Sequence, residues 1–267
     1  MTTYTTTTTK SNIVILETVK RILFIFKTIF KKVIPLALAM SVLNRLIIYV
    51  MLPETIGKWS ITANTINLGT FSDSTKILLT LPTIIQYPLF AAMLHYGYNE
   101  FNNTGQKNKI LDSLKIVARK IHVILIASIL YMLSIAAGCV VLILPGIYIL
   151  GAFSMVIPSI VIENKGVISS FKYSKSLTKG SILYILLIIA CSIVIPNALS
   201  MVIGAKIGSF IPSYIFNEVV IILFIALSNT FLASSFTFIY GELELRSAES
   251  KKIDEIREAQ EISNNQS

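Results

Sequence analysis

Residues 121–162 contain no Asp, Glu, Lys or Arg, and this stretch constrains the fold more than any other part of the chain. As one helix, rising about 1.5 Å per residue, the stretch would be about 63 Å long. The hydrocarbon core of a bilayer is about 30 Å thick, and about 20 apolar residues cross it. The stretch therefore predicts two membrane-spanning helices joined by a turn at Pro145-Gly146, with Pro145 in the first turn of the second helix.

Four other runs have the length and apolar character of a membrane span: residues 33–52, 77–96, 181–202 and 219–240. The composition agrees, because 54% hydrophobic and only 14% charged residues leave too few charges to cover the surface of a soluble protein. We therefore predict an all-α, polytopic membrane domain of six transmembrane helices over residues 12–240. Residues 1–11 form a Thr-rich segment that is expected to be disordered, and residues 241–267 form a charged cytoplasmic tail.

The distribution of basic residues predicts the orientation. Nineteen of the 23 Lys and Arg residues fall in segments on one side of the six spans, three fall on the other side, and Arg45 lies within the first span. Cytoplasmic segments of bacterial membrane proteins retain positive charge. Both termini are therefore predicted to be cytoplasmic, in a multi-pass protein of the bacterial inner (plasma) membrane.

Basic residues recur at equivalent places in three segments that enter the membrane from the cytoplasm. The segments KTIFKKVIPLALA, KIVARKIHVILIA and KSLTKGSILYILL align without gaps. They predict three helical hairpins, each preceded by a cytoplasmic amphipathic helix in the inner headgroup layer. Alternatively, orientation alone demands a basic residue before each such span. The candidate contacts with anionic lipid are Lys27, Lys31, Lys115, Arg119, Lys175 and Lys179.

Arg45 is the one charged residue well inside a predicted span, and Asn44 lies beside it. Because an isolated charge at membrane depth is costly, Arg45 is expected to face the bundle or to snorkel outward. The first alternative predicts an intramembrane polar site of Arg45, Asn44, Gln86 and Asn229. The second places the guanidinium among the outer headgroups.

Signatures of catalysis, metal binding and nucleic-acid binding are missing from the sequence. The two histidines, His95 and His122, have no carboxylate or Cys partners at ligand spacing. Cys139 and Cys191 lie in apolar runs and match no zinc or thioredoxin pattern. No soluble face interleaves basic and aromatic residues. We therefore favour a non-enzymatic protein over an enzyme, and we expect no cofactor, no metal and no nucleic-acid partner.

A further pattern occupies residues 141–187, where an apolar run leads into a Pro-Gly pair and is followed by a second proline, a glutamate and the basic segment SSFKYSKSLTKG. The residues concerned are Pro145, Gly146, Pro158, Glu163, Gly166, Ser174, Leu177, Thr178 and Gly180. This pattern resembles the YciC-like family of bacterial inner-membrane proteins, which is related to the membrane domain attached to some glycerophosphodiester phosphodiesterases. The resemblance implies a six-span inner-membrane fold and a connection with lipid or the cell envelope. It does not carry over the phosphodiesterase activity, which belongs to a soluble domain that this sequence lacks.

The function expected from these observations is that of a non-enzymatic integral membrane protein that engages anionic lipid in envelope homeostasis. Two alternatives stay open: a permease or channel-like transporter with a path through the helices, and a membrane-bound lipid enzyme. The charged tail, with Lys251/Glu255 and Arg257/Glu261 at helical spacing, is a candidate site for a protein partner.

Overall fold

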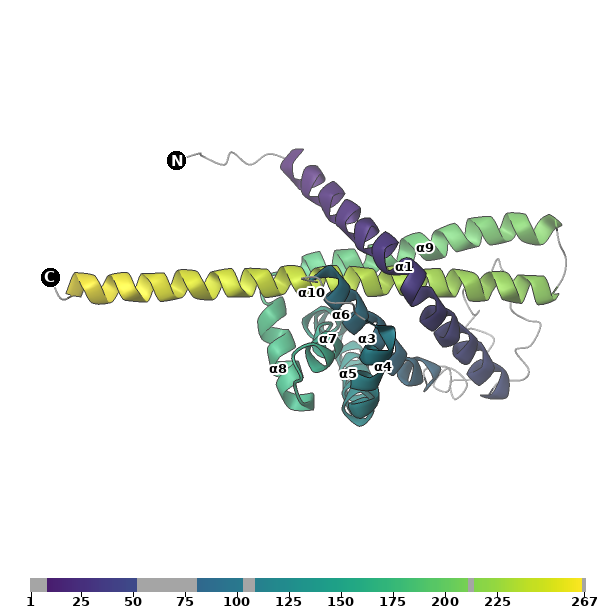
Figure 1. Ribbon diagram of the computed structural model, residues 1–267, viewed down its shortest axis with the longest axis horizontal. Helices are drawn as coiled ribbons and strands as arrows, with labels where there is room; N and C mark the ends of the chain where they lie inside the picture. The colour runs from purple at the N-terminus through teal and green to yellow at the C-terminus, as the bar shows by residue number, and fades with distance from the viewer. Residues whose placement is uncertain (1–8, 52–80, 103–108, 211–213, 266–267) are drawn as a thin grey trace.

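The computed structural model describes residues 9–51, 81–102, 109–210 and 214–265, and all regular structure in these ranges is helical (Figure 1). The helices are α1 (Thr9–Met51), α3 (Leu81–Phe101), α4 (Ile110–Arg119), α5 (Ile121–Val141), α6 (Ile143–Ala152), α7 (Val156–Val161), α8 (Val167–Thr178), α9 (Ile182–Phe210) and α10 (Tyr214–Asn265). The predicted all-α class is thus confirmed for these residues. Helix α1 already begins at Thr9, inside the segment that was expected to be disordered, and residues 1–8 lie outside the described ranges.

Four stretches of the described residues are long and apolar enough to cross a membrane: Ile121–Val140, Ile143–Val161, Ile182–Ser200 and Glu218–Ser250. They coincide with four of the six predicted spans, and they give the chain the helices of a membrane protein. The other two predicted spans, 33–52 and 77–96, extend into residues outside the described ranges. The predicted outer loop, 53–76, lies wholly outside them.

Helix α10 runs the length of the molecule, and both α1 and α9 pack against it (Figure 1). Helix α9 lies beside the first half of α10 and runs in the opposite direction, whereas α1 crosses α10 obliquely (Figure 1). The C-terminal part of α10 extends alone beyond the bundle. Because Gly241 is buried within this continuous helix, the predicted boundary between the membrane domain and the tail falls inside one element.

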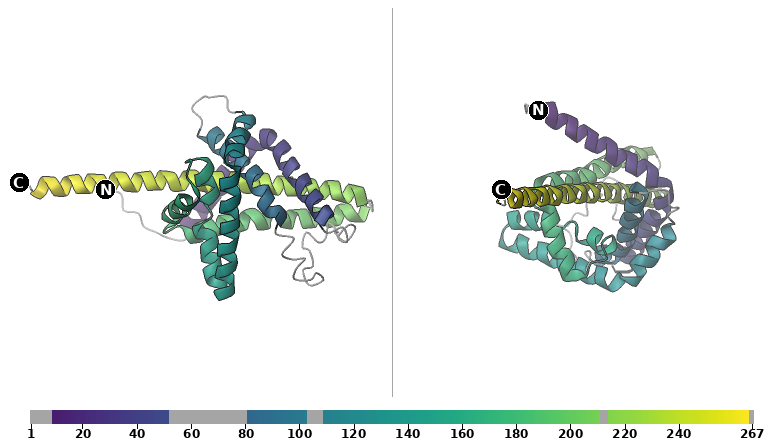
Figure 2. Two further views of the ribbon diagram at one scale, coloured as in Figure 1. Left: turned by 90° about the horizontal axis from the view of Figure 1, so that it is seen from below. Right: turned by 60° about the vertical axis from the view of Figure 1, so that its left-hand side comes forward.

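Helices α5 and α6 pack against each other and stand crosswise to α9 and α10 (Figure 2, left). The chain reverses at Leu142, whose backbone is extended between the two helices. Pro145 lies in the first turn of α6, as predicted, where its missing N–H group breaks no helical hydrogen bond. The four candidate spans therefore do not share one direction in this structure.

Close packing at this reversal requires glycine. A Cβ atom on Gly146 would lie 2.3 Å from Cys139 Sγ and 3.0 Å from the Cys139 backbone nitrogen. A Cβ atom on Gly138 would lie 2.9 Å from the Cα atom of Gly146. The Pro-Gly pair thus lets the backbones of α5 and α6 meet where the chain turns.

The fourth predicted span is interrupted between α6 and α7, at residues 153–155. Two hydroxyl groups of α8 compensate for this break: Ser174 Oγ and Thr178 Oγ1 both donate to the Ala152 carbonyl oxygen, at 2.8 and 3.1 Å. Ser174 Oγ also accepts a hydrogen bond from the Met155 backbone N–H, at 3.2 Å. Because buried backbone groups need hydrogen-bond partners, these two side chains stabilise the interruption of the helix.

The segments that precede the predicted hairpins differ in structure. Helix α4 ends at Arg119, and a break at Lys120 separates it from α5. Helix α8 ends at Thr178 and is followed by Gly180, whose φ of 80° is the left-handed conformation common just beyond a helix end. Helix α1, in contrast, passes from its basic segment into its apolar segment without a break.

The core lies where α1, α3 and α10 meet, beside α5 and α7. Its fully buried side chains include Ile25 and Ile29 of α1, Met93 of α3, Ile160 of α7 and Ile239 of α10. Aromatic rings join the same helices, with the Phe90 and Phe236 rings meeting edge to face at 5.7 Å.

Candidate lipid-binding site

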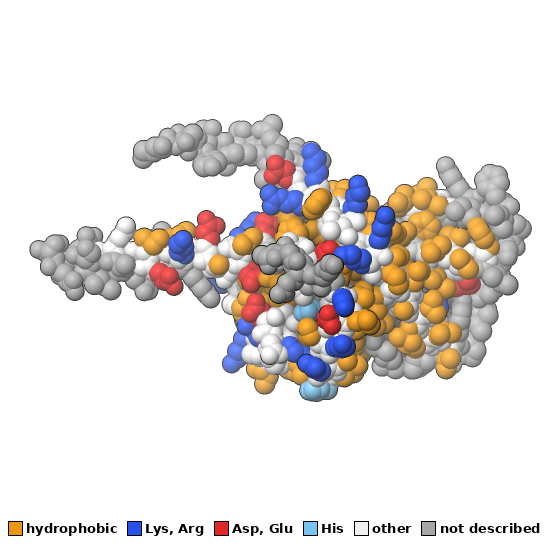
Figure 3. Space-filling view, viewed as in Figure 1, with side chains coloured by type: hydrophobic (Ala, Val, Ile, Leu, Met, Phe, Trp, Pro, Cys, Tyr) orange, Lys and Arg blue, Asp and Glu red, His pale blue; other side chains and the backbone are white. Residues whose placement is uncertain are grey.

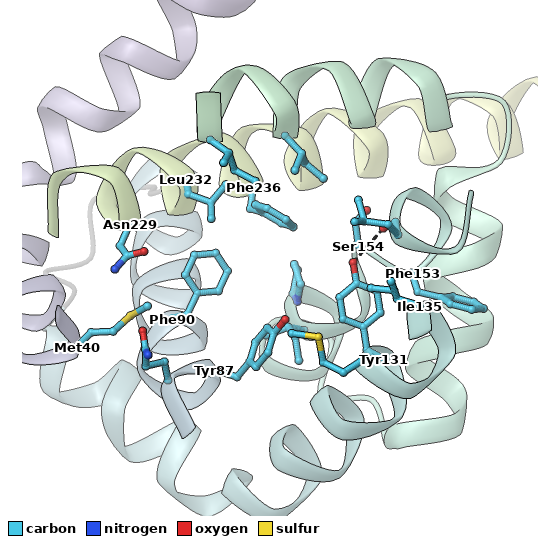
Figure 4. A pocket seen from close by; sticks show the side chains of 17 residues that line it. Met40, Tyr87, Phe90, Tyr131, Ile135, Phe153, Ser154, Asn229, Leu232 and Phe236 are labelled. Carbon is cyan, nitrogen blue, oxygen red and sulfur yellow. Dashed lines mark hydrogen bonds between the residues drawn. The ribbon is translucent and has the colours of Figure 1, made fainter. Parts of the chain in front are cut away.

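A half-open cavity of about 470 Å³ lies between the α5–α6 pair and helices α1, α3, α7, α9 and α10. Its lining is largely apolar and aromatic, and it comprises Met40, Gln86, Tyr87, Phe90, Tyr131, Met132, Ile135, Leu150, Phe153, Ser154, Ile157, Pro158, Ile189, Ile193, Asn229, Leu232 and Phe236 (Figure 4). Volumes of about 300–1,000 Å³ and a mainly apolar wall are typical of small-molecule sites. The cavity is therefore large enough for an apolar ligand.

The structure brings two of the four predicted intramembrane polar residues into this cavity. Gln86 of α3 is 6% exposed and Asn229 of α10 is half-buried, and both line the wall. The Asn229 Nδ2 atom is buried and has no hydrogen-bond acceptor among the described residues. Asn44 and Arg45 do not line the cavity.

Arg45 faces the inside of the bundle, but its ion-pair partner is a residue that the sequence did not suggest. Its Nε atom lies 3.5 Å from Oε2 of Glu218, at the start of α10, and the two side chains are 3% and 12% exposed. The pair joins α1 to α10. The outward-snorkelling arrangement is not the one that the structure adopts.

A tyrosine–glutamate layer lies beyond one end of the cavity, on α3, α8 and α10 and on the segment between α7 and α8. We define it as Tyr98, Glu163, Lys165, Tyr173, Tyr240 and Glu244. Tyr98 donates to Glu244, while Tyr240 donates to Glu163 at 3.4 Å. The Lys165 ammonium lies 3.6 Å from Glu163 and 4.1 Å from the centre of the Tyr173 ring. These contacts tie α3, α8 and α10 together beyond the end of the cavity.

The electrostatics of the layer favour protonated tyrosines. Burial, together with the hydrogen bond to Glu244, raises the pKa of the Tyr98 hydroxyl well above its ordinary value. Burial and the charge of Glu163 likewise raise the pKa of Tyr173. Both shifts favour the neutral hydroxyl, so Tyr98 remains a hydrogen-bond donor to Glu244 at physiological pH.

Further polar contacts surround this layer. Lys32 of α1 donates to Glu100 of α3 at 2.9 Å, and this hydrogen bond raises the pKa of the Lys32 ammonium. Lys120 donates to the Ile160 carbonyl oxygen at 2.8 Å, and partial burial lowers the pKa of that ammonium. His95 is buried and lies 2.9 Å from Ser113 Oγ. The two histidines and two cysteines join no group of three metal-ligating side chains within the described residues.

All six candidate lipid contacts, Lys27, Lys31, Lys115, Arg119, Lys175 and Lys179, are exposed. In the space-filling view, Lys and Arg side chains gather in a band across the middle of the molecule (Figure 3). The surface toward the end where α9 turns back into α10 is mostly hydrophobic (Figure 3). On this face, Lys and Arg side chains thus border the apolar surface (Figure 3).

The motif residues of 141–187 serve structural contacts. Ser174 and Thr178 hydrogen-bond to the break after α6, and Gly146 permits the reversal at Leu142. Pro158 lies in the first turn of α7, and Glu163 belongs to the tyrosine–glutamate layer. Leu177 is buried, whereas a side chain on Gly166 would meet no close neighbour.

Sequence reasoning missed Glu218 as the partner of Arg45, and it missed most of the cavity wall. Tyr87, Tyr131 and Ile135 are ordinary residues of an apolar helix until the fold brings them together. The one available signal was the placement of Asn229 and Gln86 within apolar runs. No protein-family description, curated protein or solved structure matches this chain.

Proposed function

We propose that this chain is a non-enzymatic, multi-pass protein of the bacterial inner membrane that binds anionic lipid, with six spans and both termini in the cytoplasm. The observation that carries the proposal is the border of exposed basic side chains beside the apolar surface (Figure 3). Lys and Arg at this position attract anionic headgroups by about 1 kcal/mol each. We also propose that the chain is a member of the YciC-like family, which has a link to the cell envelope.

The proposed topology requires that the α5–α6 pair and the α9–α10 pair change their relative orientation. Because α5 and α6 stand crosswise to α9 and α10 (Figure 2), both pairs cross one bilayer together only if they turn relative to each other. The helix breaks at Lys120 and at residues 153–155 come directly before and after the α5–α6 pair in the chain, and we propose them as the places for such a rotation. Reporter fusions at residue 66 and after residue 267 should read as periplasmic and cytoplasmic, respectively.

Lipid retention tests the binding proposal directly. We compare the wild-type protein with a Lys27→Gln/Lys115→Gln/Lys175→Gln variant and with a matched variant that has Arg at the same positions. After purification in mild detergent, mass spectrometry gives the ratio of retained phosphatidylglycerol to phosphatidylethanolamine. The Gln variant should lose at least about tenfold in this ratio, and the Arg variant should keep it, because the charge is conserved. Equal ratios in all three proteins would exclude the proposal.

The cavity favours a second candidate, a permease, because it lies inside the bundle and carries Gln86 and Asn229 on its wall. A path for a polar solute needs polar groups along its length, whereas this wall is largely apolar and aromatic. The lipid function is therefore the better supported. If proteoliposomes with the wild-type protein take up a solute, and Ile135→Trp abolishes this uptake, transport would be better supported than lipid binding.

A further inference from the structure

The geometry points to a second lipid contact, in the interior cavity. We propose that the cavity binds one hydrocarbon chain bearing an acyl carbonyl, and that Asn229 Nδ2 donates a hydrogen bond to that carbonyl oxygen. The shared chemistry, an acyl carbonyl on a hydrocarbon chain, occurs both in free fatty acids and in ester phospholipids. The inference goes beyond the proposed function, because the interior site can be occupied whether or not the basic surface binds headgroups.

The shape and wall of the cavity suit an extended apolar chain. Asn229 and Met40 lie at one end of the cavity, while Phe153 and Ser154 lie at the other (Figure 4). The rings of Phe90 and Tyr87 lie between these ends (Figure 4). A ligand that extends from Asn229 toward Ser154 therefore contacts mainly hydrocarbon and aromatic surface.

The polar groups at the far end already have partners. Tyr131 donates to the Leu150 carbonyl oxygen at 3.0 Å, and Ser154 Oγ donates to the Gly151 carbonyl oxygen at 2.8 Å. At the opposite end, Asn229 Nδ2 is buried and has no acceptor in the part of the chain that the structure describes. A buried donor without an acceptor is costly, and a ligand carbonyl would remove that cost.

This asymmetry indicates the class of ligand. One end of the cavity offers the Asn229 donor, and apart from Gln86 and the partnered hydroxyls of Tyr131 and Ser154 the wall is mainly apolar and aromatic. The matching molecule therefore has one acceptor group and a long apolar body. A plain hydrocarbon would fill the volume but leave the amide without an acceptor. A sugar, nucleotide or amino acid would bury polar groups against apolar walls, which is unfavourable.

The test is photolabelling of the purified full-length protein with three probes that carry a diazirine at the end of a sixteen-carbon chain. The probes are hexadecanoic acid, phosphatidylglycerol with that acyl chain, and hexadecane. Half-labelling concentrations give apparent affinities, and mass spectrometry of the peptides locates the label. Because the carbonyl end of the chain is proposed to lie at Asn229, label on peptides at the opposite end of the cavity, around Phe153 and Ser154, is expected with at least one acyl probe. Labelling by the acid alone identifies free fatty acid as the ligand, and labelling by phosphatidylglycerol identifies membrane lipid.

Two pairs of measurements decide the inference. Ile135→Trp fills the cavity and should abolish labelling there. Leu133 lies on the same helix but is 60% exposed, so Leu133→Trp should leave the labelling unchanged. Asn229→Leu should raise the half-labelling concentration of the preferred acyl probe about tenfold and leave that of hexadecane unchanged. This second comparison holds even if the Trp variant does not fold. Equal effects of Asn229→Leu on both probes, or label confined to peptides outside the cavity wall, would overturn the inference.

Discussion

Arg45 of α1 and Glu218 of α10 form an ion pair inside the bundle, with Arg45 Nε and Glu218 Oε2 3.5 Å apart. The two residues are far apart in the chain, and α1 and α10 make the most extensive helix contact of the described structure. In lipid, each charge needs the other, because water is not there to solvate it. The pair therefore fixes how the C-terminal part of α1 meets the start of α10.

Removal of one partner of this pair should be more harmful than removal of both. Glu218→Gln removes the carboxylate that lies beside the buried guanidinium and should destabilise the fold by about 3–5 kcal/mol. The double variant Arg45→Met/Glu218→Leu replaces both charges by apolar groups and should recover most of that loss. Thermal unfolding in detergent, followed by circular dichroism, measures the difference. A double variant less stable than Glu218→Gln would contradict the proposed role of the pair.

The contacts of α8 with the helix break predict a second effect. Combined substitution Ser174→Ala/Thr178→Val deprives the Ala152 carbonyl oxygen and the Met155 N–H of side-chain partners, and we expect a loss of about 1–3 kcal/mol in unfolding free energy. Ser176→Ala is the matched control, because the Ser176 hydroxyl is exposed and donates only within its own helix, to Tyr173. If both variants unfold at the same temperature, the hydroxyls do not support the break.

The reversal between α5 and α6 predicts a steric effect at Gly146. A methyl group there would meet Cys139 at 2.3 Å, so Gly146→Ala should destabilise the protein by about 1–3 kcal/mol. Gly166→Ala serves as the control, because the nearest atom would be Ser169 Oγ at 3.8 Å. Guanidinium or SDS titration of both variants gives the comparison. If Gly146→Ala leaves the stability of the protein unchanged, α5 and α6 do not approach each other this closely.

The sequence allowed the membrane class and four spans to be predicted because lipid imposes local requirements, namely apolar length and bordering cations. The break at residues 153–155 could not be predicted, since it depends on Ser174 and Thr178 reaching it from another helix. Glu218 lies at the end of a span, as its position in the sequence indicated, but nothing local reveals that α1 meets α10 there. The cavity wall could not be predicted, because residues such as Tyr87 and Ile135 are also common at positions that face lipid.

Titration of Tyr98 predicts a loss of stability at alkaline pH. The pKa of Tyr98 in the folded protein lies above the ordinary value of about 10, because of burial and Glu244. The stabilisation is therefore fully present below about pH 10 and is lost as the pH rises toward the folded-state pKa. Between about pH 9 and 11, Tyr98→Phe should show a shallower fall of Tm than the wild-type protein. If the Tm of both proteins falls equally with pH, Tyr98 does not contribute to the pH dependence of stability.

The most direct test of the membrane assignment uses the two native cysteines, Cys139 and Cys191, whose side chains are exposed on apolar helices. The protein is placed in bilayer nanodiscs, which leave both membrane faces open to a charged, membrane-impermeant maleimide. We predict that neither cysteine is labelled until SDS is added, because hydrocarbon surrounds both. Rapid labelling of either residue in intact nanodiscs would place its helix in water and contradict the prediction.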